Sequence, residues 1–185
     1  MLARIGKMFA REEAPVSAPA ETVPVQVKQL ENLCVDLGHA VKKMDAHAVT
    51  TILEEIETFY KLEEESLSIH KIKHWAGEIA SIKAEYQTAL LTEKINQAII
   101  SKNINRPEGR CLQNSTRKQW IIPQDCDTPN KIREYIATMG ECSRENISLV
   151  FSGSKVRTDD DLLSRNEKCD VVIKVPEEIP AQFLV

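Results

Sequence analysis

The sequence predicts an α+β protein, in which an N-terminal all-α helical bundle is followed by a small domain that mixes strands with one helix. Two observations lead to this prediction. Residues 25–102 contain no proline, only two glycines, and apolar residues at three- and four-residue steps, which is the pattern of amphipathic helices. The later chain instead carries short runs rich in β-branched residues, at 119–122, 147–151 and 170–175.

The composition is that of an ordinary globular protein. Of the 185 residues, 42% are hydrophobic and 28% are charged, which suits one or two packed domains. The formal net charge of −4 argues against a general nucleic-acid binder. Five scattered cysteines without a C-x-x-C pair, no secretory signal and no long apolar run predict an intracellular protein with reduced thiols. We expect it in the cytoplasm, with the nucleus as the alternative.

The first 24 residues divide into a basic amphipathic segment and a linker. A helix over residues 1–11 would separate apolar from basic side chains, namely Leu2, Ile5, Met8 and Phe9 from Arg4, Lys7 and Arg11. Such a segment suits contact with an anionic membrane or the start of a targeting sequence, although Glu12 and Glu13 are unusual in the latter. We favour a frayed terminus over both. Residues 12–24 contain three prolines, which predicts a disordered linker.

Three helices are predicted between residues 25 and 102. The first two carry apolar residues on one face, and Asp45 is placed to cap the start of the second. The third begins near Ile69 and continues through Ile99, so it measures roughly 50 Å at 1.5 Å per residue. Because the first two helices are shorter, its far end must rest on the C-terminal domain, on a second copy of the chain or on a partner. The long helix therefore offers a surface for a homo-oligomer.

The second domain is organised around one helix. Thr128 is a good N-cap, Pro129 suits the first helical position and Gly140 stops the helix. Ile132 and Ile136 lie four residues apart on one face. Strands are expected around this helix, at 119–122, 147–151, 155–156 and 170–175. The chain then divides into an N-terminal segment with its linker, a helical bundle, a second linker, this domain and a tail, at 1–24, 25–102, 103–109, 110–176 and 177–185.

This second domain resembles ubiquitin and the ubiquitin-like domains, which have the β-grasp fold. The resemblance lies in Asp127 and Thr128 at the helix start, and in Ile132 and Ile136 on the helix. It also lies in residues 149–153, which stand where ubiquitin has Leu-Ile-Phe-Ala-Gly. The resemblance implies a C-terminal ubiquitin-like β-grasp domain. Its first hairpin is the weakest part of the match.

The resemblance also implies a partner-binding surface, reduced relative to that of ubiquitin. Ubiquitin binds partners through a leucine, an isoleucine and a valine around a histidine. Here Val150 takes the isoleucine position, Val172 and Lys174 lie near the histidine and valine positions, and polar residues replace the leucine. We expect the partner-binding residues to be Leu149, Val150, Phe151, Val172 and Lys174. The chain ends without the Gly-Gly pair that conjugation needs, so we do not expect a conjugated modifier.

The helical half is similar in places to two helical families. Residues 52–56 and the leucines that follow look a little like the N-terminal helical domain of the transcription elongation factor TFIIS, which docks short disordered peptides. The same run is similar to the BAG domain, a chaperone-binding three-helix bundle. Because leucine-rich amphipathic helices share this pattern widely, we carry no functional residue over from either family.

The sequence contains no motif for catalysis, cofactor binding or metal binding. His70 and His74 lie four residues apart but lack a third ligand, no glycine-rich loop suits a phosphate, and no cysteine lies in a nucleophile motif. We expect a non-enzymatic intracellular adaptor or scaffold without a cofactor, which binds protein partners through the ubiquitin-like domain and the helical bundle. Two alternatives stay open. One is a structural subunit of a larger assembly, and the other is a membrane-surface protein guided by residues 1–11.

Overall fold

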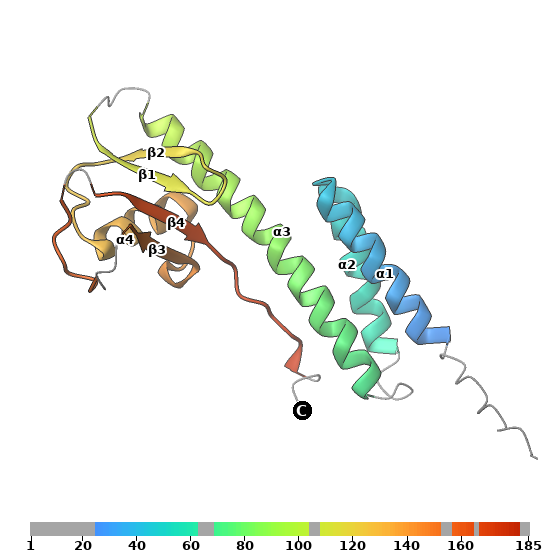
Figure 1. The fold of residues 1–185 in the computed structure, drawn as a ribbon. Coiled ribbons are helices and arrows are strands. Elements are labelled where there is room, and N and C mark those ends of the chain that lie inside the picture. Colours follow the sequence, from blue (N-terminus) through green and yellow to red (C-terminus); the bar gives the residue numbers. More distant parts are fainter. Residues whose placement is uncertain (1–24, 63–68, 104–107, 153–156, 165–166, 182–185) are drawn as a thin grey trace, which may run out of the picture.

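The structure, a computed structural model, describes residues 25–62, 69–103, 108–152, 157–164 and 167–181 (Figure 1). Three helices come first and pack together, namely α1 (Val25–Lys42), α2 (Ala46–Leu62) and α3 (Ile69–Asn103). A small mixed sheet with one further helix follows, so the predicted α+β class with an all-α first half is confirmed. The amphipathic segment predicted at 1–11 and the short strand predicted at 155–156 lie outside the described residues.

The core of the helical half is built on α1, which contacts both α2 and α3. Leu30 and Leu37 of α1 are fully buried and pack with Ile56 of α2 and Ile79 of α3. Each such side chain contributes about 2 kcal/mol when it leaves water. The helix α2 begins as predicted, because the carboxylate Oδ1 of Asp45 accepts the Ala48 N–H at 3.1 Å.

The sheet of the C-terminal half has four strands in the order β2-β1-β4-β3. Its strands are β1 (Arg110–Asn114), β2 (Gln119–Ile122), β3 (Ile147–Phe151) and β4 (Cys169–Ile173). The central pair β1 and β4 runs parallel, and both outer pairs run antiparallel. A short 3₁₀ turn, η1 (Arg144–Asn146), precedes β3. Val171 and Ile173 of β4 both point into the core, while Asp170 and Val172 between and beside them are exposed.

The helix α4 (Pro129–Gly140) begins where the sequence predicts and ends one residue later. The Thr128 hydroxyl accepts the Lys131 N–H at 3.3 Å, which confirms the N-cap. The left-handed residue that ends the helix is Glu141, with φ of 52°, so the prediction that Gly140 stops it was wrong. Gly140 is instead the place where α3 approaches closely, since a Cβ there would lie 2.9 Å from the Ile95 side chain.

The helix α3 belongs to both halves of the molecule (Figure 1). Ala76, Ile79 and Tyr86 lie in the core of the helical half, whereas Ile95 and Ile99 lie in the core of the sheet. The sequence allowed the far end of α3 to rest on the C-terminal domain, on a second copy or on a partner. In the structure it packs on the C-terminal domain. No helix of the described ranges combines the length and the apolarity that crossing a membrane requires.

Residues 174–181 return from β4 alongside α3 to the helical half (Figure 1). The Val175 N–H donates to the Thr88 hydroxyl of α3 at 2.9 Å. Ile179 then packs against the core of the helical half. This returning segment is a second connection between the two halves. The sequence predicts a strand through residue 175 and a tail from residue 177, whereas the structure ends β4 at Ile173.

Candidate functional site

One face of the sheet is covered, and the other is exposed. Ile132 and Ile136 of α4, together with Ile95 and Ile99 of α3, pack in one core with the inward side chains of the strands. The outward side chains of all four strands are exposed, namely Cys111, Gln113, Gln119, Ile121, Ser148, Val150, Asp170 and Val172. We call these eight residues the open face.

Two valines form the main apolar contact on the open face. Val150 is 53% exposed and Val172 is 38% exposed. In the antiparallel pair of β3 and β4, Val150 lies opposite Asp170 and Val172 lies opposite Ser148. The two valines are therefore diagonal neighbours on the same side of the sheet, at a separation of about 7–8 Å between backbones. A partner can cover both valines with a single apolar side chain or a short stretch of chain.

The five predicted partner-binding residues fall on two sides of the sheet. Val150 and Val172 belong to the open face, and Lys174 is exposed just beyond the end of β4. Leu149 and Phe151 are half-buried and pack against the core on the covered side. The reason is the period of two in a strand, which turns neighbouring side chains to opposite faces.

A polar hollow adjoins the valines on the open face. It has a volume of about 540 Å³ and lies between the ends of β1 and β4, where Gln113, Gln119, Lys168 and Asp170 are among its lining residues. Asp170 is also the cross-strand neighbour of Val150. The open face therefore combines a small apolar contact with a hydrogen-bonding hollow next to it. That combination suits the binding of a protein surface rather than of a fully enclosed small molecule.

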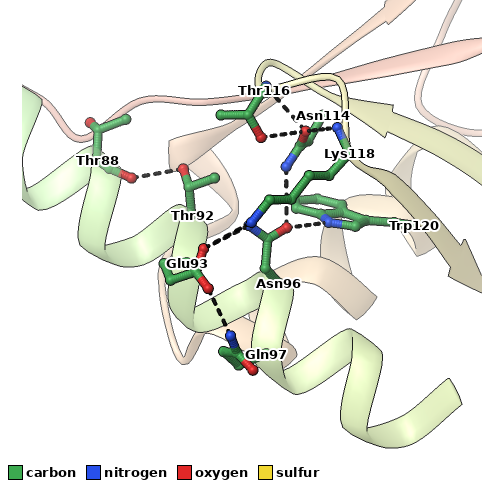
Figure 2. A network of polar contacts seen from close by, with 9 residues as sticks. All are labelled: Thr88, Thr92, Glu93, Asn96, Gln97, Asn114, Thr116, Lys118 and Trp120. Carbon is green, nitrogen blue, oxygen red and sulfur yellow. Dashed lines mark hydrogen bonds and ion pairs between the residues drawn. The ribbon is translucent and has the colours of Figure 1, made fainter. Parts of the chain in front are cut away.

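A buried polar network fastens the sheet to α3 (Figure 2). Asn96 of α3 is only 2% exposed. Its carbonyl Oδ1 accepts the Trp120 indole N–H at 2.6 Å and the Asn114 amide at 3.2 Å. Its own amide donates to a carboxylate oxygen of Glu93 at 3.2 Å. Each polar atom of the Asn96 side chain thus has a partner, as burial of an amide requires.

The turn between β1 and β2 belongs to the same network (Figure 2). The Asn114 Oδ1 accepts the backbone N–H groups of Thr116 at 3.1 Å and Lys118 at 2.8 Å, and also the Thr116 hydroxyl. Arg117 takes a left-handed φ of 61° inside this turn. A side-chain oxygen that replaces backbone acceptors is the usual way in which asparagine stabilises a turn. Asn114 therefore sets the shape of the hairpin and connects it to Asn96.

Glu93 connects the exposed end of the network to the hairpin turn. The Lys118 ammonium lies 3.2 Å from the Glu93 carboxylate, and the Gln97 amide donates to that carboxylate at 2.7 Å. Hydrogen bonds from Gln97, Asn96 and Lys118 lower the pKa of Glu93. The network is absent from the expectations set by the sequence. The one available signal was Trp120, because a buried indole N–H needs an acceptor.

A buried arginine holds the loop that precedes β4. Arg110 is 5% exposed, and its guanidinium donates to the backbone carbonyls of Leu163 at 3.0 Å and Ser164 at 2.9 Å. Glu167 secures the same loop, because it pairs with Arg157 and accepts the Ser164 N–H at 3.2 Å. These contacts position the start of β4, and with it Asp170 on the open face.

The buried thiols are poor nucleophiles. Burial raises the pKa of Cys126 to about 11 and the pKa of Cys169 to about 12. Burial also raises the pKa of Cys142. Because the thiolate is the reactive form, Cys126 and Cys169 stay protonated at neutral pH and act as small apolar groups in the core.

Comparison of the chain with protein-family models, with curated proteins and with solved structures yields no match.

Proposed function

We propose that this protein is a non-enzymatic adaptor, whose C-terminal domain binds a protein partner through the open face. The observation that carries the proposal is the pair of exposed, diagonal valines, Val150 and Val172, on a sheet whose other face packs against α3 and α4. A few central apolar side chains supply most of the binding energy at such surfaces, while polar neighbours exclude water around them. Lys168, Asp170 and Lys174 are the charged neighbours here.

We propose further that the C-terminal domain is a ubiquitin-like β-grasp domain. Three features support this reading: the central parallel pair β1 and β4, the antiparallel partners β2 and β3 outside it, and the single helix α4 on one face. On this reading Val150 stands in the place of the isoleucine through which ubiquitin binds its receptors. The polar turn at Asn114–Thr116 replaces the leucine, so the proposed partner differs from an ordinary ubiquitin receptor.

The connection through α3 would give the two halves of the adaptor a fixed relative orientation. The Asn96 network and the returning segment at residues 174–181 hold the sheet to the same helix that completes the core of the helical half. A partner bound on the open face is therefore held at a fixed orientation to α1 and α2. This is what a scaffold needs if its helical half binds a second protein.

Affinity capture with the full chain tests the proposal. We expect Val150→Glu to abolish recovery of a defined set of proteins from a cell extract, because a carboxylate cannot be buried in an apolar contact without a partner. The loss at a central contact corresponds to about 2–4 kcal/mol, or more than tenfold in recovery. Val35→Glu is the matched control, since Val35 of α1 is 51% exposed and lies far along the chain from the sheet. Equal recovery by both variants would contradict the proposal.

A second candidate function is that of a structural subunit in a larger assembly. It is favoured by Leu90 and Ile100 of α3, which are 46% and 54% exposed on the helix that joins the two halves. In that case Val150→Glu leaves the assembly intact, whereas Leu90→Glu or Ile100→Glu disrupts it. Size-exclusion chromatography of the complex recovered from cells separates the two functions.

A further inference from the structure

The hollow on the open face is an opening between the two central strands of the sheet. Among the described residues, β1 and β4 pair over two positions only, and this pairing stops at Gln113 and Asp170. The hollow, of about 540 Å³, lies before that point, between the starts of the two strands. Leu112 and Cys169 line it although their side chains are buried in the core. These two residues therefore present their main chain to the hollow.

The pairing of β1 with β2 shows which main-chain groups of β1 face the hollow. Residues of an antiparallel pair alternate between those that bond to the partner strand and those that point to the other side. The Asn114 N–H donates to the Lys118 carbonyl, so Asn114 and Leu112 direct their main-chain groups toward β2. Cys111 and Gln113 consequently direct their N–H and C=O groups toward β4.

The same alternation orients the main chain of β4. The Lys174 N–H donates to the Asn146 carbonyl at 2.8 Å, so the even-numbered residues of β4 bond toward β3. Cys169 and Val171 therefore direct their main-chain groups toward β1. Both central strands thus send main-chain groups into the space between them.

Two of these main-chain groups lie outside the described pairs of the two strands. In a parallel pair, a residue bonds to the two neighbours of the residue opposite it. Gln113 lies opposite Asp170, so it engages the C=O of Cys169 and leaves the N–H of Cys169 unengaged. Because the pairing begins at Gln113, the C=O of Cys111 is unengaged as well. A donor and an acceptor from two different strands therefore face the same hollow.

The hollow favours a neutral occupant that both donates and accepts hydrogen bonds. Main-chain N–H and C=O groups that are withdrawn from the sheet require other partners. Lys168 and Asp170 lie exposed at this hollow with opposite charges, so a carboxylate there meets Asp170 and an ammonium meets Lys168. A carboxamide is neutral and carries N–H donors beside a C=O acceptor. Gln113 and Gln119 also line the hollow and bring carboxamides that can pair with such a group.

We propose that the hollow holds the carboxamide of an asparagine or glutamine side chain of the protein partner. This rests on the proposed function, because the same partner covers Val150 and Val172. The Cys169 N–H donates to the carboxamide oxygen, and the carboxamide nitrogen donates to the Cys111 C=O. The hollow lies just beyond β4 as seen from Val150, roughly 8 Å away at a strand spacing of about 4.8 Å. In an extended partner segment, the carboxamide then lies about two or three residues from the apolar anchor.

Selection of phage-displayed random peptides on the immobilised full chain tests the proposal. We expect the selected sequences to share an apolar residue with asparagine or glutamine about two or three residues away, enriched at least about threefold over the unselected library. The reason is that a site built from hydrogen-bonding groups rejects analogues that lack them. A synthetic peptide of the most enriched sequence should bind at least about tenfold more tightly than the same peptide with aspartate or leucine at the carboxamide position, as measured by fluorescence anisotropy.

Two variants of the open face separate the hollow from the valines. Cys111→Phe places a large side chain at the hollow, because Cys111 is exposed and lines it. We expect this variant to lose the preference for a carboxamide and to keep the preference for an apolar residue. Ile121→Phe is the matched control, since Ile121 lies opposite Cys111 on the same face but does not line the hollow. Val150→Glu should remove both preferences, because it disables the contact on which the proposed function rests.

Amide hydrogen exchange, followed by nuclear magnetic resonance, tests the premise without a partner. In the free full chain, we expect the Cys169 N–H to exchange at least about a hundredfold faster than the Val171 N–H, which belongs to the paired stretch. Binding of the selected peptide should slow exchange at Cys169 at least about tenfold. Unchanged protection of Val171 in the Cys111→Phe variant shows that this variant keeps its fold.

Four results would overturn the proposal. Protection of the Cys169 N–H equal to that of Val171 in the free chain removes its premise. Selected peptides that share the apolar residue but prefer no carboxamide, or prefer a hydroxyl or charged side chain, overturn it and leave the proposed function in place. Loss of the carboxamide preference in Ile121→Phe as well as in Cys111→Phe shows that the hollow is not the site. A selection without any enriched sequence overturns both this proposal and the proposed function.

Discussion

The two ends of α3 are held by different kinds of contact. Toward its N-terminus, Ala76 and Ile79 pack on α1 through apolar surfaces. Toward its C-terminus, Ile95 and Ile99 do the same in the core of the sheet, but Asn96 between them also bonds to the indole of Trp120. Apolar packing tolerates small shifts as long as volume is conserved, whereas a buried hydrogen bond requires its donor and acceptor at one distance. The position of α3 is therefore fixed more narrowly at its sheet end than at its end in the helical half.

The largest effect is expected from Asn96→Leu. Leucine has nearly the same volume but leaves the Trp120 indole N–H buried without its acceptor and removes the bond from Asn114. We expect unfolding free energy to fall by about 3 kcal/mol, since each buried donor left unpaired costs about 1–3 kcal/mol. Gln97→Leu is the control, because Gln97 is exposed and bonds only to Glu93 within the network, so its loss should stay below about 0.5 kcal/mol. Urea unfolding of the full chain measures both, and equal losses would remove the distinction between the two ends of α3.

Two glycine-to-alanine variants should change the free energy of unfolding by intermediate amounts. Gly140→Ala places a Cβ 2.9 Å from the Ile95 side chain, so we expect a loss of about 2 kcal/mol from overpacking. Gly77→Ala lies on α3 in the helical half and meets nothing within 4 Å, so we expect a gain of about 0.5–1 kcal/mol from helix propensity. Thermal unfolding followed by circular dichroism gives the sign of each change. A gain at Gly140 would show that α3 and α4 can separate slightly without cost.

The smallest effect concerns pH and the ion pair of Glu93. The folded pKa of Glu93 is lowered, so its hydrogen bonds stabilise the protein above the ordinary pKa of a glutamate and are lost as pH falls through the lower, folded value. We expect Glu93→Gln to flatten the pH dependence of the urea midpoint in that acidic window. Glu85→Gln removes an exposed carboxyl from the same helix, and Glu85 makes none of the hydrogen bonds to Glu93, so this variant should leave the wild-type slope in place. Parallel curves for wild type and Glu93→Gln would exclude a contribution from this contact.

The candidate site was only partly predictable from the sequence. The resemblance to ubiquitin pointed to five residues, of which Val150, Val172 and Lys174 are exposed near one another. Leu149 and Phe151 pack inward, and the period of two along β3 already separates them from Val150. The resemblance gave no sign of the polar hollow beside Asp170, because its walls come from the separate strands β1 and β4.

The sequence by itself determined the elements whose signals are local. The caps at Asp45 and Thr128 lie within three residues of the N–H groups that they accept, and the periods of 3.6 and 2 describe neighbours along one helix or strand. These signals act before the chain has closed any long loop. They therefore predicted three helices, the strands β2, β3 and β4 and the start of α4.

Only the tertiary structure decided how these elements are joined. Asn96 and Trp120 are 24 residues apart, Arg110 and Leu163 are 53 apart, and Thr88 and Val175 are 87 apart. Each of these pairs meets only after loops have closed and apolar faces have packed, and many other pairs of polar residues fit the same local pattern. For that reason the sequence left three supports open for the far end of α3. The buried acceptor of Asn96 selects one of them, because burial leaves the Trp120 indole no water to bond.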